Sequence, residues 1–367
     1  MKNFLLVIFI VFIAFMFKDS IDYIQYNSAP IGSGQTAERA KILEVIPKDK
    51  GEALKIELLT GDLKGAAFII DNSYYFSDYY VRPFKENNVL IVSLDRSQNG
   101  SEPVITLLNY ARDSINFYLL FVFFALLVAV GKKQGAKSAV SLIITILIII
   151  KVMLPLILQG YNPIICATLC CFAISVFNLL ILTGVSRKTT ATLAGTSFGV
   201  LVAGLLSYAV GILSHFSGLN DDDSLLLTTF QQGNMDLNGI LFAGILIGTL
   251  GAVMDVSMSV SSAMYEITAN NPRINKVKLI RSGLNVGRDV MGTMADTLIL
   301  AYASTAIPLL LFSISRQTPL IILLNSESIS TEILRALSGS IGIILSIPAT
   351  SFAFAIFTYK RRKVNIS

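Results

Sequence analysis

Two aspartates lie inside segments of the chain that are apolar enough to cross a membrane. Asp255 falls within the run from 239 to 263, and Asp296 falls within the run from 290 to 312. An ionisable side chain at membrane depth costs about 2.5 to 3.5 kcal/mol on insertion scales, so it usually marks a water-filled cavity or a pathway. These two residues are therefore the strongest candidates for chemistry.

Polar residues repeat at helical spacing around each aspartate. Spacings of three or four residues place side chains on one face of a helix. The first stripe consists of Asp255, Ser259, Ser262 and Glu266, and the second of Arg281, Asn285, Asp289, Gly292 and Asp296. The two helices would be antiparallel neighbours. At 1.5 Å per residue, both aspartates would lie about 10 Å from the same edge of the membrane.

Two carboxylates that share a site with little water compete for ionisation, so one of them would hold a proton near neutral pH. Such a pair could couple the movement of protons or cations to that of a solute. The candidate transport and coupling residues are Asp255, Asp296, Ser259, Ser262, Glu266, Asn285, Asp289 and Thr293.

A purely structural interpretation of these residues is also open. Glu266 and Asp289 would then be charges at the membrane interface that pair with Arg281 or Arg288. Nearby Ser and Thr groups would form hydrogen bonds with Asp255 and Asp296. The methionines around the aspartates could form a soft Cu(I) site, but flexible packing explains them more simply. We expect neither a metal nor a cofactor.

Glycines recur at GxxxG spacing, which lets helix backbones approach closely. In the two polar helices the pairs are Gly244 with Gly248 and Gly283 with Gly287, and Gly292 follows five residues later. We expect them to pack helices or to loosen the start of the second polar helix, as broken helices do at transporter sites. GTSFG at 195–199 also matches the G-x-S-x-G nucleophile motif, but that motif needs a strand-to-helix turn and this segment is continuously apolar. With no other catalytic motif, we do not expect an enzyme.

The composition is that of an integral membrane protein. Of 367 residues, 53% are hydrophobic and 14% are charged, and the mean hydropathy is +0.67. A helix needs about 20 apolar residues to cross the hydrocarbon core. Eight runs approach this length, at residues 4–17, 115–130, 138–158, 163–182, 191–214, 239–263, 290–312 and 333–357. We therefore predict an α-helical bundle of about eight transmembrane helices.

Basic residues alternate with these runs and predict the topology. They fill the segments 132–137, 187–188, 273–288 and 360–363, whereas 159–163 and 215–238 carry no Lys or Arg. By the positive-inside rule both termini are cytoplasmic. Positive charge dispersed in this way is not a nucleic-acid surface, so the lipid bilayer is the expected partner. Residues 1–18 are expected to be an uncleaved anchor, because no small-residue cleavage site follows the apolar run.

Residues 19–114 differ in composition and would lie outside the cytoplasm. In the segment 53–59, Leu54, Ile56 and Leu58 alternate with polar residues, as in a half-buried strand. Further strands are predicted at 40–46, 66–71, 87–94 and 103–108, with a turn at 61–65. About five short strands predict a small β-barrel of the OB or SH3-like kind. The predicted domains are thus the anchor at 1–18, this β domain at 19–114 and a seven-helix membrane domain at 115–367.

The segments GTLGAVMDVSMSVSSAMYEI and RSGLNVGRDVMGTMADTLILAYASTAIPLLL resemble the hallmark region of the YibE/F family of bacterial multi-spanning membrane proteins. The resemblance extends over the whole chain and is most specific across 248–311. It implies a polytopic protein of the bacterial plasma membrane, and the family is described only as predicted membrane proteins or permeases. The residues that match its signature are Asp255, Ser259, Ser262, Glu266, Arg281, Asn285, Arg288, Asp289 and Asp296.

We expect an ion- or proton-coupled secondary transporter or permease of an unidentified small solute, with a homo-oligomer as one possible assembly. The alternative is a membrane receptor or assembly protein that does not transport and whose external β domain binds a peptide, lipid or protein partner. The acidic segment 221–223 and the tyrosine-rich stretch 74–80 motivate this alternative.

Overall fold

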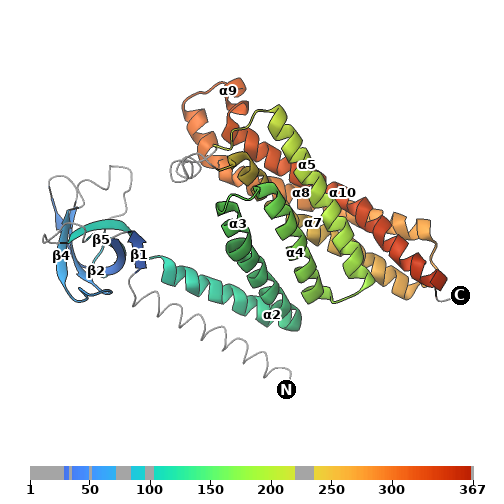
Figure 1. Cartoon of the computed structure of the whole chain (residues 1–367), viewed down its shortest axis with the longest axis horizontal. Coiled ribbons are helices and arrows are strands. Elements are labelled where there is room, and N and C mark those ends of the chain that lie inside the picture. Colours follow the sequence, from blue (N-terminus) through green and yellow to red (C-terminus); the bar gives the residue numbers. More distant parts are fainter. Residues whose placement is uncertain are drawn as a thin grey trace, which may run out of the picture. The chain divides into compact units, whose positions relative to one another are not determined.

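The computed structural model describes residues 29–32, 35–48, 52–71, 84–95, 103–219 and 235–364. The predicted anchor, the tyrosine-rich stretch and the acidic segment 221–223 lie outside these residues. The chain forms two compact units, Met1–Ala136 and Lys137–Ser367. Figure 1 shows the sheet of the first unit and the helices of the second.

The first unit contains an antiparallel sheet. Its strands are β1 (Ala29–Gly32), β2 (Gln35–Pro47), β3 (Glu52–Leu58), β4 (Ala67–Asp71), β5 (Val89–Asp95) and β6 (Val104–Tyr110). Their order is β4-β3-β2-β5-β6, and β1 pairs with β2. The first half of β2 pairs with β5 and the second half with β3. The five predicted strand segments are confirmed.

Alternation of side chains explains why these segments fold as strands. Leu54, Ile56 and Leu58 on β3 are at most 1% exposed, while Lys55 and Glu57 between them are half-buried. The buried residues of β3 meet those of β2 and β5, including Ile42 and Leu90, in one apolar core. The predicted turn lies between β3 and β4, where Gly61 and Gly65 have positive φ angles of 77° and 86°, which glycine adopts without strain.

A buried polar corner lies beside this core. The carboxylate of Glu38 accepts hydrogen bonds from the hydroxyls of Thr36 (3.1 Å) and Thr60 (2.6 Å). The Thr60 hydroxyl also accepts from the backbone N–H of Arg39 at 2.8 Å. Glu38 and Thr60 are 3% and 1% exposed, so water cannot replace these bonds.

Replacing Thr60 by Val should therefore loosen β2 and β3. The change removes the Thr60 partner of Glu38 Oε2 and of the Arg39 N–H, which costs about 1 to 3 kcal/mol. Hydrogen exchange of the full-length protein, followed by mass spectrometry, measures this cost in the β2 and β3 peptides. Thr106→Val on β6 is the matched control, and equal protection in both variants would contradict the role of Thr60.

An ion pair connects the sheet to the first helix of the membrane part. Arg39 on β2 is 6% exposed, and its guanidinium bonds the carboxylate of Asp113. Burial lowers the pKa of Arg39 by desolvation, and the nearby carboxylate offsets that cost. Asp113 is the first residue of α2 (Asp113–Ile148), where a negative charge also suits the helix dipole.

The remaining elements are helical. After α2 come a π-helical turn η1 (Ile149–Met153), α3 (Leu154–Leu158), α4 (Pro163–Thr183), α5 (Arg187–Leu213), α7 (Leu237–Asn270), α8 (Lys276–Ser315), α9 (Leu320–Leu324) and α10 (Glu327–Val364). Polar side chains cap the starts of α4, α5, α7 and α8, namely Asn162, Ser186, Asp236 and Asn275. Such caps satisfy backbone N–H groups that the helix itself cannot.

Within the described part of the chain, six helices are long and apolar enough to cross a membrane. This confirms the predicted class, a membrane-spanning helical protein, whereas the count of eight spans is not confirmed. One predicted span, at 4–17, lies outside the described residues. Two others, at 115–130 and 138–158, fall in one helical run, Asp113–Leu158, whose backbone leaves helical geometry at Lys132.

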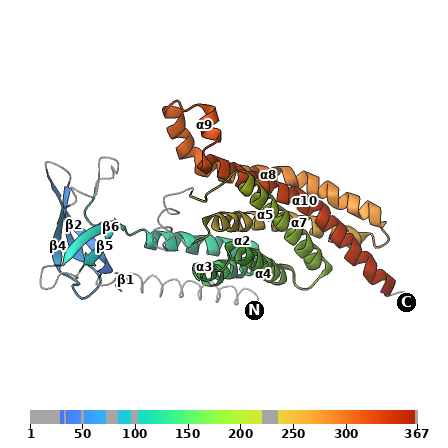
Figure 2. The ribbon, with the colours of Figure 1, turned by 45° about the horizontal axis from the view of Figure 1, so that its top comes forward.

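Helices α5, α7 and α10 pack against one another, with α8 on α7 and α10, and α4 on α5 and α7. Figure 2 shows these helices running side by side. On α4 and α5 the outward side chains are large and apolar, for example Leu169, Phe172 and Leu205, as expected for surfaces that face lipid.

Glycines allow the backbones of α5 and α10 to approach closely. A Cβ atom placed on Gly199 would lie 2.7 Å from the carbonyl oxygen of Gly342, and one on Gly342 would lie 2.8 Å from that of Gly199. One turn away on α5, a Cβ on Gly195 would overlap the Thr350 hydroxyl. The motif at 195–199 therefore packs helices, and it lies inside one continuous helix rather than at a strand-to-helix turn.

Candidate functional site

The polar stripe of α7 lies on an open side of the helix. Asp255, Ser259 and Glu266 are exposed, and Ser262 is half-buried with its hydroxyl donating to the backbone carbonyl of Met258 at 2.6 Å. Gly244 and Gly248 continue the same line and are exposed as well. The face of α7 that carries Asp255 is thus small and polar along its length.

The polar stripe of α8 is open too. Its exposed residues are Arg281, Asn285, Arg288, Asp289, Gly292, Thr293 and Asp296. Among the described residues, neither arginine forms an ion pair with Glu266 or Asp289. The opposite side of α8 is tightly packed, because a Cβ on Gly283 would meet Met264 and one on Gly287 would meet Ile347. Gly292 has open space instead.

Contacts between α7 and α8 set the relative depth of the two aspartates. Gly248 lies against the hydroxyl of Tyr302, and Gly283 lies against Met264. These antiparallel contacts place Asp255 and Asp296 within about one helical turn of each other along the helices. Around α8, however, Asp296 is about 120° from Tyr302 at 100° per residue. The two carboxylates therefore lie at similar positions along the helices, but Asp296 does not point into the contact between α7 and α8.

Several hydroxyl groups on α5 and α7 are buried, unlike the two aspartates. Thr192 on α5 and Ser261 on α7 are fully buried and bond each other at 2.6 Å. Ser207 and Thr249 are also fully buried, and each donates to a backbone carbonyl of its own helix. These four buried hydroxyls form hydrogen bonds inside the protein, whereas the two acids at mid-helix are exposed.

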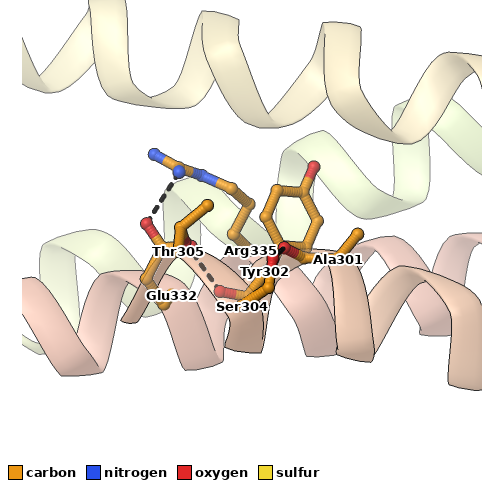
Figure 3. A network of polar contacts seen from close by, with 6 residues as sticks. All are labelled: Ala301, Tyr302, Ser304, Thr305, Glu332 and Arg335. Carbon is orange, nitrogen blue, oxygen red and sulfur yellow. Dashed lines mark hydrogen bonds and ion pairs between the residues drawn. The ribbon is translucent and has the colours of Figure 1, made fainter. Parts of the chain in front are cut away.

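A second polar group lies where α8 meets α10 (Figure 3). Arg335 on α10 donates from Nη1 to Oε1 of Glu332 at 2.8 Å. Its guanidinium also lies over the ring of Tyr302, 5.6 Å from the ring centre. Because the Tyr302 hydroxyl reaches Gly248, this group touches the face of α7 that carries Asp255.

Sequence reasoning overlooked this group, although a signal was present. Arg335 lies inside the apolar run predicted at 333–357, so the rule that selected Asp255 and Asp296 also selects it. The contribution of Tyr302 was not visible, since a tyrosine in an apolar run is ordinary. Only the packing of α8 against α10 puts its ring beneath the guanidinium.

Three cysteines, one lysine and a cavity lie outside both polar groups. Cys166, Cys170 and Cys171 are buried, free thiols on α4. Lys151 is exposed on the π-helical turn η1. A cavity of about 420 Å³ lies between the loop after α3 and the start of α7, lined by Tyr161, Asn162 and Asp236 among others. Asn162 and Asp236 already act there as helix caps.

Comparison with known proteins gives one match. A family model described as YibE/F-like protein matches residues 119–360. The chain belongs to the YibE/F-like family. The match spans α2 to α10 and so includes both polar groups, but it begins after the sheet. No curated protein and no solved structure matches the chain.

Proposed function

We propose that this YibE/F-like protein is an ion- or proton-coupled transporter of a small solute, in which Asp255 and Asp296 carry the coupling charge. One observation supports this most. The two carboxylates lie at one level of the membrane helices, and both are exposed. An open carboxylate at this depth needs water, an ion or a partner, and a hydrated path supplies the first two.

Polar and small residues extend beyond the two aspartates, as expected for a hydrated path through the helices. Gly248 and Asp255 are about two turns apart on one face of α7, roughly 10 Å. Gly248 contacts Tyr302, and Tyr302 contacts Arg335. Polar and small groups therefore extend from Asp255 to the Arg335 group, and Ser259 and Thr293 border the same open sides.

We also propose the number of membrane spans, the side of the membrane on which the termini lie and the form of the β domain. Eight spans result if the run Asp113–Leu158 crosses twice, with its reversal at Lys132, and if residues 4–17 cross as well. Both termini are then cytoplasmic by the positive-inside rule, in the plasma membrane of a bacterium. The order β4-β3-β2-β5-β6 suits a small, partly open barrel outside the cytoplasm.

Thiol labelling tests whether the path holds water. In a variant whose three native cysteines are replaced by Ala, Ser259→Cys and Thr293→Cys should react with a charged, water-soluble methanethiosulfonate reagent. We expect labelling at least about ten-fold faster than at Leu169→Cys, because a thiol in lipid stays protonated and unreactive. Leu169 is the control because it is an exposed apolar residue of α4. Equal rates at all three positions would remove the basis for a path.

A further inference from the structure

We propose that Arg335, Thr331 and Tyr302 form a binding site for a small organic monocarboxylate. This deepens the transport proposal by naming a substrate class, and it rests on that proposal for its role. Binding itself is measurable at equilibrium without transport. A failed binding test and a failed flux test are therefore distinguishable.

Unsatisfied hydrogen-bonding atoms are the first argument for a ligand. Arg335 Nε, Glu332 Oε2 and Thr331 Oγ1 are buried, and none has a partner among the described residues. Thr331 is 1% exposed. A buried polar atom that has lost its water and has no partner destabilises the folded protein. Two of these atoms, Arg335 Nε and Thr331 Oγ1, are donors within about one turn of α10, and they indicate a place that an acceptor completes.

The chemistry of the donors selects a carboxylate. Thr331 and Arg335 are four residues apart on α10, so they lie on one face of the helix. The free Nε–H and the hydroxyl are both donors, and a guanidinium presents its N–H groups in a fork that matches the two oxygens of a carboxylate. The Tyr302 ring covers the guanidinium and limits its contact with water. A monovalent anion suits a site with one arginine.

The Glu332 carboxylate competes with the carboxylate of a ligand for the Arg335 guanidinium. It holds Arg335 through a single N–O contact and leaves its own Oε2 without a partner. The Arg335 guanidinium therefore keeps its Nε–H available for the carboxylate of a ligand. This arrangement predicts that removal of the Glu332 charge strengthens binding, whereas a purely structural ion pair predicts only a loss of stability.

Isothermal titration of the full-length protein in nanodiscs tests the site, with sodium acetate and sodium L-lactate as probes and sodium chloride as the ionic control. We expect a dissociation constant below about 1 mM for at least one carboxylate. Arg335→Lys keeps the charge but loses the fork and should weaken binding roughly ten-fold or more. Glu332→Gln should tighten binding several-fold.

The matched control is Arg316→Lys, since Arg316 also lies over an aromatic ring, that of Phe312, but caps the end of α8. It should bind as the parent does. If Arg335→Lys does not fold, Thr331→Val replaces it with the same expectation. The proposal is overturned if neither carboxylate binds the folded parent, if the Arg335 or Thr331 variant binds like the parent, or if Glu332→Gln weakens binding.

Discussion

Proteoliposomes that contain Asp255→Asn should lose coupled flux, with a rate roughly ten-fold or more below that of the parent protein. Asn has nearly the shape of Asp but can neither carry a charge nor take up a proton. Because Asp255 is open, the change leaves the packing of α7 intact. The loss would therefore report coupling rather than folding.

The measurement is internal acidification, followed with a pH-sensitive dye while a panel of organic acids, amino acids and inorganic cations is added outside. Asp296→Asn should behave like Asp255→Asn, since both residues lie at one level of the helices. Asp236→Asn is the matched control, because Asn serves as well as Asp at a helix cap and Asp236 caps the same helix. Full flux in either mid-helix variant would refute the coupling role.

Gly199→Leu should have the largest effect on stability. A Cβ there already meets the Gly342 carbonyl at 2.7 Å and Val253 at the same distance. Backbone carbonyls cannot move aside as flexible side chains can, so α5 and α10 would have to separate. The expected loss is about 3 kcal/mol or more, because overpacking costs about 1 to 3 kcal/mol even for smaller insertions.

Thermal unfolding in detergent, followed by circular dichroism, measures this loss. Gly251→Leu is the matched control, since a Cβ at Gly251 has no neighbour within 4 Å. It should melt at or above the temperature of the parent, because leucine favours a helix more than glycine does. If both variants melted together, the contact between α5 and α10 would not limit stability.

Predictions that depend only on a local pattern of residues, such as the strands, agree with the structure. The strand β3 follows from alternation at Leu54, Ile56 and Leu58, whose side chains are all buried. The ends of helices were less predictable. α7 continues to Asn270 and α8 begins at Lys276, beyond the apolar runs 239–263 and 290–312. Hydropathy detects contact with lipid, whereas a helix continues for as long as its backbone bonds are favourable.

By itself, the sequence determined the membrane class, the strand-rich region and the residues too polar for their surroundings, because hydropathy and periodicity are properties of neighbouring residues. Only the tertiary structure decided which of those residues meet. Helices α7, α8 and α10 touch through residues far apart in the chain, such as Gly248, Tyr302 and Arg335. The rotation and depth of each helix are set by close packing at glycines, and no local pattern encodes that fit.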